Sequence, residues 1–139
     1  MLCKSEKCSN ILLDMNKLDI LGVYNLSEDH HSKHYTDIQL NYHKITHDFH
    51  LGEQLSIELP EELTFNDEIF IGIDFIHQDN NPSLLLIDNN QYGSTNFIYT
   101  DNSPVKSRSL FPCMDTPLIK SSYRAKLLVP NGYKAVFSG

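Results

Sequence analysis

Apolar residues recur mostly at every second position of this chain, and Asn, Asp, Gly and Pro interrupt them at short intervals. This spacing is typical of strands with one buried face that are joined by tight turns. The clearest case is the stretch 54–59, where Leu55, Ile57 and Leu59 alternate with polar residues and predict a half-buried strand. No window of ten or more residues carries the apolar stripe of a helix. The pattern predicts an all-β domain, an antiparallel β-sandwich or saddle-like sheet.

Further strands follow from the same alternation. The stretches 18–24 and 38–42 predict strands with one apolar face, whereas 69–76 is apolar on both faces and predicts a central strand. A short buried strand is expected at 84–87 and another short strand at 97–99, because the polar runs 77–82, 88–96 and 100–104 read as turns and loops.

The C-terminal stretch carries a hairpin signal. Residues 122–129 and 133–137 both alternate, and Pro130, Asn131 and Gly132 lie between them. An Asn-Gly pair favours a tight hairpin turn, because both residues tolerate a positive φ. A strand pair around residues 131–132 is therefore expected.

Length and charge narrow the functional classes. The 139 residues fit one domain, and 18 Asp plus Glu against 11 Lys plus Arg argue against nucleic acid and anionic membranes as partners. No stretch approaches the roughly 20 apolar residues of a membrane helix, and the start MLCKSEKCSN has no apolar run of the signal-peptide kind. A cytoplasmic location is therefore expected.

The chain has three cysteines at irregular spacing, which predicts reduced thiols and not a disulfide framework.

Several residues invite a chemical interpretation. The six histidines between positions 30 and 50 could form a metal site if a helix brought them onto one face. Ile45, Thr46 and Phe49 disfavour such a helix, so an exposed polar hairpin is preferred. No His is followed by Glu, so the zinc-peptidase motif His-Glu-x-x-His is absent. Cys113, with Asp115 close by, predicts an inert thiol. No catalytic residue and no metal ligand are assigned in this chain. The six histidines are His30, His31, His34, His43, His47 and His50.

The C-terminal third resembles a known family. Residues 108–117 read RSLFPCMDTP and are followed by SSYRAKLLVPNGYKAVFSG. This is similar to the R-x-x-x-P-C-x-D-T-P stretch and following strand pair in the N-terminal β domain of M1-family zinc aminopeptidases, in the branch of leukotriene A4 hydrolase, aminopeptidase B and aminopeptidase O. The resemblance covers residues 11–139, most specifically the last 32. It implies a partial N-terminal β domain over 11–139, clipped at both ends, after an N-terminal tail at 1–10.

Local chemistry and the resemblance together point to roles for single residues. Arg108 is expected to pair with Asp115, which is expected to act as an N-cap, and the motif to be architectural. The family carries Gln or Glu seven and five residues before the motif Arg, and the second of them lies near the free amino end of the bound peptide. Counting back without gaps places Asp101 and Ser103 there, so both depart from the family pattern. They are the candidate substrate-binding residues, and Asp101 could attract an ammonium group.

The function implied is that of a non-catalytic domain that docks on a following catalytic domain and walls the peptide cleft. The parent enzyme would release N-terminal amino acids from peptides, with its zinc held in that catalytic domain. This chain is expected to hold no cofactor and to be inactive by itself. Its expected partners are the catalytic domain, the peptide at the domain edge and a second copy bound through uncovered strands.

A different class remains open. The chain could be a stand-alone β-sandwich module that binds a protein or peptide through its loops or strand edges, without enzymatic activity. A His-rich metal-binding protein is a third and weaker alternative. The presence of an in-frame His-Glu-x-x-His downstream in the gene would distinguish the first two.

Overall fold

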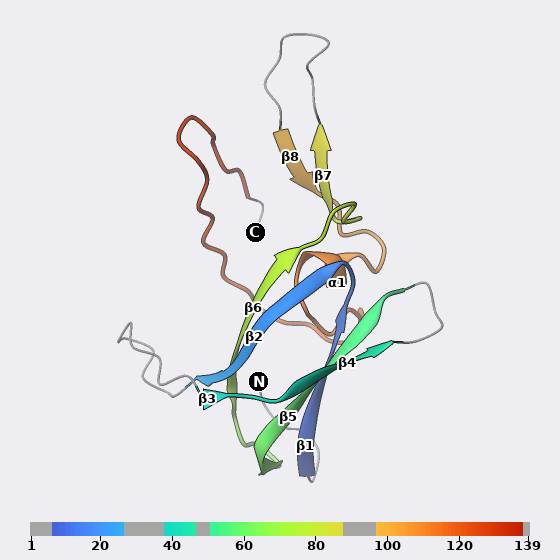
Figure 1. Cartoon of the computed structure of the whole chain (residues 1–139), viewed down its shortest axis with the longest axis vertical. Helices are drawn as coiled ribbons and strands as arrows, with labels where there is room; N and C mark the ends of the chain where they lie inside the picture. Colours follow the sequence, from blue (N-terminus) through green and yellow to red (C-terminus); the bar gives the residue numbers. More distant parts are fainter. Residues whose placement is uncertain (1–6, 27–37, 47–50, 88–96, 138–139) are drawn as a thin grey trace.

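A computed structural model describes residues 7–26, 38–46, 51–87 and 97–137. The described chain is built almost entirely of antiparallel strands, with one single-turn helix, and this confirms the all-β prediction (Figure 1). The elements are β1 (Lys7–Met15), β2 (Leu18–Leu26), β3 (Ile38–Gln39), β4 (Tyr42–Thr46), β5 (Glu53–Thr64), β6 (Phe70–His77), β7 (Leu84–Ile87), β8 (Phe97–Thr100) and α1 (Ser107–Leu110).

The strands form two three-stranded sheets, ordered β1-β5-β4 and β3-β2-β6, and a separate pair, β7-β8. Consecutive strands β1 and β2 belong to different sheets although only Asn16 and Lys17 separate them. Lys17 has a φ of 55°, and the Asn16 N–H donates to the Arg108 carbonyl at 2.9 Å. The link is therefore a corner between sheets and not a hairpin turn.

The core lies between the two sheets. In β1 the side chains of Ile11, Leu13 and Met15 are buried while Leu12 is exposed, as expected of a strand with one buried face. The register pairs Ile11 with Ile57 and Leu13 with Leu55, so buried residues of β1 face buried residues of β5. Burial of each such side chain contributes about 1.5–3 kcal/mol. The most deeply buried apolar residues are Met15, Leu18, Val23, Leu55 and Ile57.

Several predicted strands are confirmed and others need correction. The stretch 54–59 lies in β5, and 97–99 lies in β8. The stretch 84–87 forms β7, half-buried rather than buried. The stretch 38–42 is not one strand: β3 pairs with β2, and the chain then changes sheets at Leu40 and Asn41 before β4 pairs with β5. The Leu40 N–H donates to the Val23 carbonyl of one sheet, and the Asn41 carbonyl accepts from Glu58 N–H of the other, both at 2.9 Å.

The first strand was not expected from the sequence pattern. β1 begins at Lys7, within the stretch predicted as an N-terminal tail, and it precedes the strand expected to open the domain. Its burial alternates from Ile11 onward, but the sequence Ile-Leu-Leu there does not, and the residues before it are polar or small.

The prediction of a central strand at 69–76 is wrong. β6 pairs with β2 on one side, and no other described strand pairs with its second side. Its apolar residues on both faces have a different cause. On one face Ile71, Ile73 and Phe75 pack against the core, and on the other Phe70 lines an open cleft while Ile76 is exposed.

The C-terminal hairpin prediction is correct for the turn and wrong for the strands. The Tyr133 N–H donates to the Pro130 carbonyl at 3.1 Å, and Gly132 has a φ of 91°. However, no strand ladder forms between residues 118 and 137, although the rings of Tyr123 and Phe137 approach edge to face at 5.8 Å. Figure 1 shows this segment running away from the two sheets on the side of β7 and β8.

The cysteines differ from the expectation of reduced thiols. Cys8 in β1 is disulfide-bonded, whereas Cys113 is a free thiol. No helix among the described residues has the length and hydropathy to cross a membrane.

Candidate functional site

The predicted site residues lie on the segment 100–116, which the body of the domain holds at several points. Asn81 is buried, and its side-chain amide donates to the Ser109 carbonyl at 2.7 Å. The Asn16 side chain donates to Ser109 Oγ at 3.1 Å, and the Ser83 hydroxyl donates to the Lys106 carbonyl. The Asn81 bond satisfies a carbonyl near the C-terminal end of the short helix α1, and the three bonds together fix the position of the segment.

Asp101 and Ser103 lie together at the start of this segment. One carboxylate oxygen of Asp101 accepts the Ser103 backbone N–H at 3.1 Å, an arrangement typical of an Asx turn. The other oxygen lies 2.7 Å from the Lys106 ammonium. The Lys106 hydrogen bond, followed by the Ser103 backbone N–H, lowers the pKa of Asp101 from its ordinary value. Both oxygens of this carboxylate therefore have partners within the chain, and the one that could receive a substrate ammonium holds Lys106.

Three charged residues, Arg108, Asp115 and Asp14, form a cluster that holds residues 108–117; we call these the Arg108 cluster and the motif loop. Arg108 Nε donates to Asp115 Oδ2 at 3.0 Å, which confirms the predicted pair. Arg108 also reaches Asp14 Oδ2 at 3.6 Å, and this same oxygen accepts the Asp115 backbone N–H at 3.1 Å. The Arg108 and Asp115 side chains are only 11% and 12% exposed. The motif therefore ties the loop to β1, in agreement with the architectural role expected for it.

The predicted N-cap role of Asp115 is wrong. Its carboxylate accepts the backbone N–H of Arg108 at 3.3 Å, and no helix follows it in the described part of the chain. Thr116 instead forms a local turn, because its hydroxyl accepts the Leu118 N–H at 3.4 Å and its carbonyl accepts the Ile119 N–H at 3.2 Å.

Cys113 lies beside this cluster and pairs with β1 through an antiparallel bridge to Asp14, with hydrogen bonds of 2.8 and 3.1 Å. Burial, with the charges of Asp115 and Asp14, raises the pKa of Cys113 to about 11. A thiol with this pKa is almost entirely protonated at neutral pH and is a poor nucleophile. This agrees with the prediction of an inert thiol.

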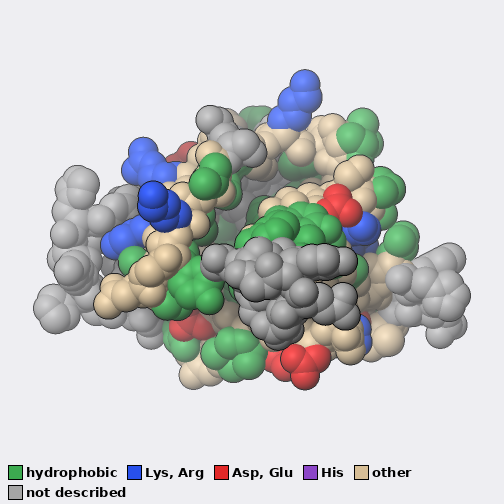
Figure 2. All heavy atoms as spheres, turned by 90° about the horizontal axis from the view of Figure 1, so that it is seen from above, with side chains coloured by type: hydrophobic (Ala, Val, Ile, Leu, Met, Phe, Trp, Pro, Cys, Tyr) green, Lys and Arg blue, Asp and Glu red, His purple; other side chains and the backbone are tan. Residues whose placement is uncertain are grey.

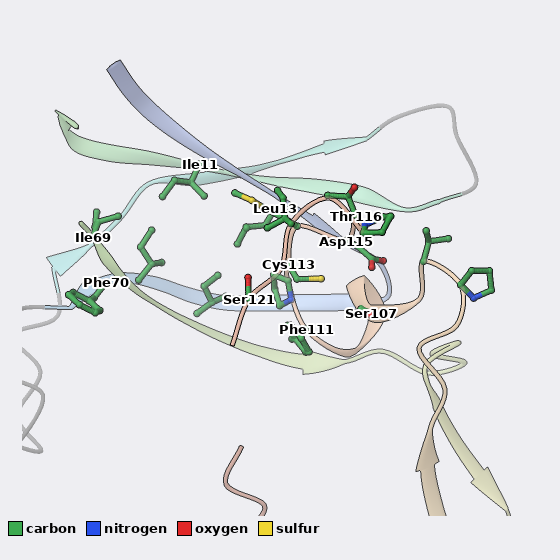
Figure 3. A pocket seen from close by; sticks show the side chains of 18 residues that line it. Ile11, Leu13, Ile69, Phe70, Ser107, Phe111, Cys113, Asp115, Thr116 and Ser121 are labelled. Carbon is green, nitrogen blue, oxygen red and sulfur yellow. The ribbon is translucent and has the colours of Figure 1, made fainter. Parts of the chain in front are cut away.

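An apolar cleft opens between the two sheets. Its volume is about 920 Å³, and its walls come from β1, β6 and the segment 104–121. Figure 3 shows Ile11 and Leu13 on one wall, Ile69 and Phe70 toward one end, and Phe111 with Cys113 on the motif loop. We call it the intersheet cleft. It holds one carboxylate, Asp115, which is already paired with Arg108, so it offers apolar contact rather than an acid–base pair.

The structure brings together no metal site in the part of the chain that it describes. Of the candidate histidines, His43 is exposed on β4. His30, His31, His34, His47 and His50 lie outside the described residues, so the predicted polar hairpin and the metal alternative both stay predictions. His77, the seventh histidine, contacts the Leu110 carbonyl through Nε2 at 2.9 Å.

Comparison with known proteins identifies the family. The model of the family described as "Peptidase M1 N-terminal domain" matches residues 1–139. The chain belongs to this family. Aminopeptidase B of Mus musculus is 48% identical over 42 residues, which are 30% of this chain and 6% of that protein. Leukotriene A-4 hydrolase of Xenopus laevis is 30% identical over 95 residues, which are 67% of this chain and 15% of that protein.

The longest of these matches extends over nearly the whole chain. Leucine aminopeptidase 2 of Saccharomyces cerevisiae (strain YJM789) is 29% identical over 96% of this chain and 18% of that protein. The fold is similar to that of native yeast LTA4 hydrolase, with a TM-score of 0.66 and 24% identity over 84% of this chain and 17% of that one. This M1 N-terminal domain thus spans less than a fifth of the length of these relatives.

Sequence reasoning missed two residues of the site. Lys106 is paired with the carboxylate of Asp101, which was expected to bind a substrate amine. The spacing of five residues between Lys106 and Asp101 was the available signal of this pair. Asp14 completes the Arg108 cluster from β1, and no local pattern indicates that contact, because the two residues are far apart in the sequence.

Proposed function

We propose that this M1 N-terminal domain docks on the catalytic domain of a zinc aminopeptidase and forms part of the wall of its peptide cleft. The observation that carries the proposal is the family match over residues 1–139. The activity of the whole enzyme would be the release of N-terminal amino acids from peptides. Zinc would be held by the catalytic domain, because none of the described residues here forms a metal-binding group.

The rigidity of the motif loop supports this role. A residue that positions a substrate is effective when the backbone carrying it is fixed. The Arg108 cluster and the buried Asn81 amide hold the segment that presents Asp101 and Ser103 at an exposed edge. We infer that Asp101 contributes to the amino-end subsite by exchanging its contact with Lys106 for the ammonium group of the peptide, while Ser103 offers its hydroxyl.

The proposal is tested with a chimera of yeast leucine aminopeptidase 2 in which this chain replaces the matching N-terminal segment. We expect hydrolysis of aminoacyl fluorogenic substrates, and none from this chain alone. A folded, zinc-loaded chimera without activity would count against the docking role.

A second measurement tests the site residues in the same chimera. Asp101→Asn should raise KM for substrates with a free amino group and leave kcat less affected, because a charge that binds the ground state is lost. Asp79→Asn, on a described turn outside the segment 100–116, is the matched control and should change neither constant. Equal effects of the two substitutions would refute the role of Asp101.

The expected binding of a second copy is also a proposal. It is supported by the large apolar side chains that the described chain exposes at its C-terminal end. The same feature supports the alternative of a stand-alone binding module, which would bind partners yet leave the chimera inactive.

We propose a cytoplasmic location, on the sequence expectation alone. Disulfides are rare in that compartment, so the bond at Cys8 supplies a test. Alkylation of cell extracts before denaturation should find Cys8 reduced if the location is right, and protected if the protein resides in an oxidising compartment.

A further inference from the structure

Residues 103–106 have the sequence Ser-Pro-Val-Lys, a pattern that one class of protein kinases recognises. Proline-directed Ser/Thr kinases bind the residue after the acceptor in a pocket that gives its backbone N–H no partner, and proline has no N–H to leave unpaired. A basic side chain three positions after the acceptor pairs with anionic groups of the kinase. Ser103 is followed by Pro104 and, at the third position, by Lys106, so it has both determinants.

No other residue of the sequence combines the two determinants. Six prolines occur in the chain, and besides Pro104 only Pro117 follows a Ser or Thr, namely Thr116. The third position after Thr116 is Ile119, which is not basic. The sequence therefore offers one acceptor for such a kinase and one internal control.

The structure presents Ser103 to solvent. Residues 102–105 are exposed and belong to the turn between β8 and α1. The Ser103 backbone N–H donates to Asp101 Oδ1 at 3.1 Å, whereas its hydroxyl forms no hydrogen bond within the part of the chain that the structure describes. Viewed from the end of the molecule at which β7 and β8 lie, acidic and basic side chains reach the open surface among hydrophobic ones (Figure 2). A kinase can therefore reach the acceptor oxygen.

The turn at residues 102–106 is held weakly. A kinase binds its acceptor in an extended groove, so this turn has to open. Val105 has a φ of 51°, a left-handed conformation that is strained for a β-branched residue. The Lys106 N–H reaches the Asn102 carbonyl only at 3.4 Å. Opening the turn relieves the strain and loses one long hydrogen bond, so it costs less free energy than opening a regular strand.

Ser83 confines the opening to this turn. It is buried, its carbonyl accepts the Asp101 N–H at 3.0 Å, and its hydroxyl donates to the Lys106 carbonyl. Both ends of the turn are therefore attached to one residue of the body of the domain. The motif loop beyond the turn is held separately by the Arg108 cluster. We expect the turn to open without releasing its two ends.

We propose that Ser103 is the acceptor of a proline-directed Ser/Thr protein kinase, and that its phosphate takes Lys106 away from Asp101. The kinase transfers the γ-phosphoryl group of ATP to Ser103 Oγ. The bond between that group and the oxygen of the β-phosphate breaks, ADP leaves, and a base of the kinase takes the hydroxyl proton. The modification does not depend on the aminopeptidase role. It requires the cytoplasmic location proposed above, where ATP and such kinases are found.

The charges around Ser103 make the modification a switch. In the unmodified chain the Lys106 ammonium lies 2.7 Å from Asp101 Oδ2, and the two side chains are 35% and 39% exposed. A phosphoserine carries more negative charge than a carboxylate and offers three strong acceptor oxygens. It would stand three residues before Lys106 in the same turn, where it competes for the ammonium and repels the Asp101 carboxylate. Lys106 should therefore move to the phosphate and leave one Asp101 oxygen free.

Phosphorylation is tested on the purified full chain with a cyclin-dependent kinase and Mg-ATP. We expect one phosphate per chain, mapped to Ser103 by tandem mass spectrometry, and none on Ser103→Ala. Pro104→Ala restores the backbone N–H and Lys106→Gln removes the charge, so each should slow the reaction roughly tenfold. A wild-type chain that takes no phosphate, or takes it only at other residues, would overturn the proposal.

Ile119→Lys is the matched control for the contribution of the fold. It gives Thr116 both sequence determinants, but Thr116 lies in the motif loop beside Asp115, whose side chain is only 12% exposed, and its hydroxyl accepts the Leu118 N–H. The folded variant should therefore be phosphorylated at Ser103 and not at Thr116. Equal rates at the two residues would refute the claim that the exposed turn selects the acceptor.

Capture of Lys106 is measured by phosphorus NMR on the phosphorylated chain. A neighbouring ammonium favours the dianion, so the second pKa of the phosphate should be lower in the wild-type chain than in Lys106→Gln phosphorylated by a longer reaction. Lys126→Gln removes an exposed lysine outside the segment 100–116 and should leave this pKa unchanged. The same pKa in the wild-type chain and in Lys106→Gln would refute the switch.

The switch has a consequence for the amino-end subsite, and this consequence rests on the proposed function. In the chimera described above, phosphorylation of Ser103 should lower KM several-fold for substrates with a free amino group, because the amine no longer has to displace Lys106 from Asp101. Kinase treatment of the Ser103→Ala chimera should leave its KM unchanged. An active chimera whose KM does not respond would refute this consequence. An inactive chimera would count against the docking role, while the kinase and NMR experiments still decide the modification and the switch.

Discussion

The Arg108 cluster allows a stability prediction with a defined size. Replacing Arg108 by Met keeps much of the aliphatic volume but removes the charge shared by Asp115 and Asp14. Two carboxylates that are 12% and 24% exposed then remain close together without a counter-ion. Removing one partner of a buried ion pair costs about 3–5 kcal/mol. Because Asp14 keeps some contact with water, we expect about 3 kcal/mol for Arg108→Met.

For a domain of this size the loss corresponds to a fall in Tm of roughly 10 °C. The free energy of unfolding is measured in urea by far-UV circular dichroism, since the chain has no Trp. The matched control is Lys7→Met, which breaks a 2.7 Å ion pair with Glu62 whose side chains are 71% and 57% exposed. An exposed pair contributes about 0–1 kcal/mol, so this control should be nearly neutral.

A double variant identifies the cause of the loss. Arg108→Met combined with Asp115→Asn should be more stable than Arg108→Met alone, because one uncompensated charge is removed. The reasoning would be refuted if Arg108→Met lay within about 0.5 kcal/mol of the Lys7→Met control, the scatter expected of an ordinary surface substitution.

Three further predictions concern backbone strain, pH and metal. Gly52 has a φ of 108°, and an added Cβ would lie 2.5 Å from the Met15 carbonyl oxygen, so Gly52→Ala should lower the free energy of unfolding in urea by about 2–4 kcal/mol. Gly132 has a φ of 91°, but an added Cβ would meet nothing within 4 Å, so Gly132→Ala should lower it by about 1 kcal/mol or less. The folded-state pKa of Cys113 is raised, so the folded state keeps its proton longer than the unfolded state does, and stability should fall as pH rises from about 9 to about 11; a Cys113→Ala variant with the same slope in that range would contradict this. Dialysed protein should retain no stoichiometric zinc by elemental analysis and release no fluorophore from aminoacyl substrates, whereas retained zinc with chelator-sensitive turnover would return the histidines at 30–50 to consideration.

The local sequence determined the class of structure and part of the site. Alternation of apolar and polar residues places β5 where it is found, because a strand with one buried face needs that period whatever it pairs with. Gly132 marks a turn for an equally local reason, its positive φ. The Arg108–Asp115 pair was predictable because both residues belong to one short motif.

Tertiary structure alone decided which strands meet. β1 and β2 are separated by two residues yet belong to different sheets, since Lys17 turns the chain and the strands find partners far along the sequence, β5 and β6. The edge position of β6 and the absence of a ladder at 118–137 have the same origin, because a period of two specifies a face and not a neighbour. Asp14 meets Arg108 because the segment 100–116 lies against β1, and no local pattern specifies that contact.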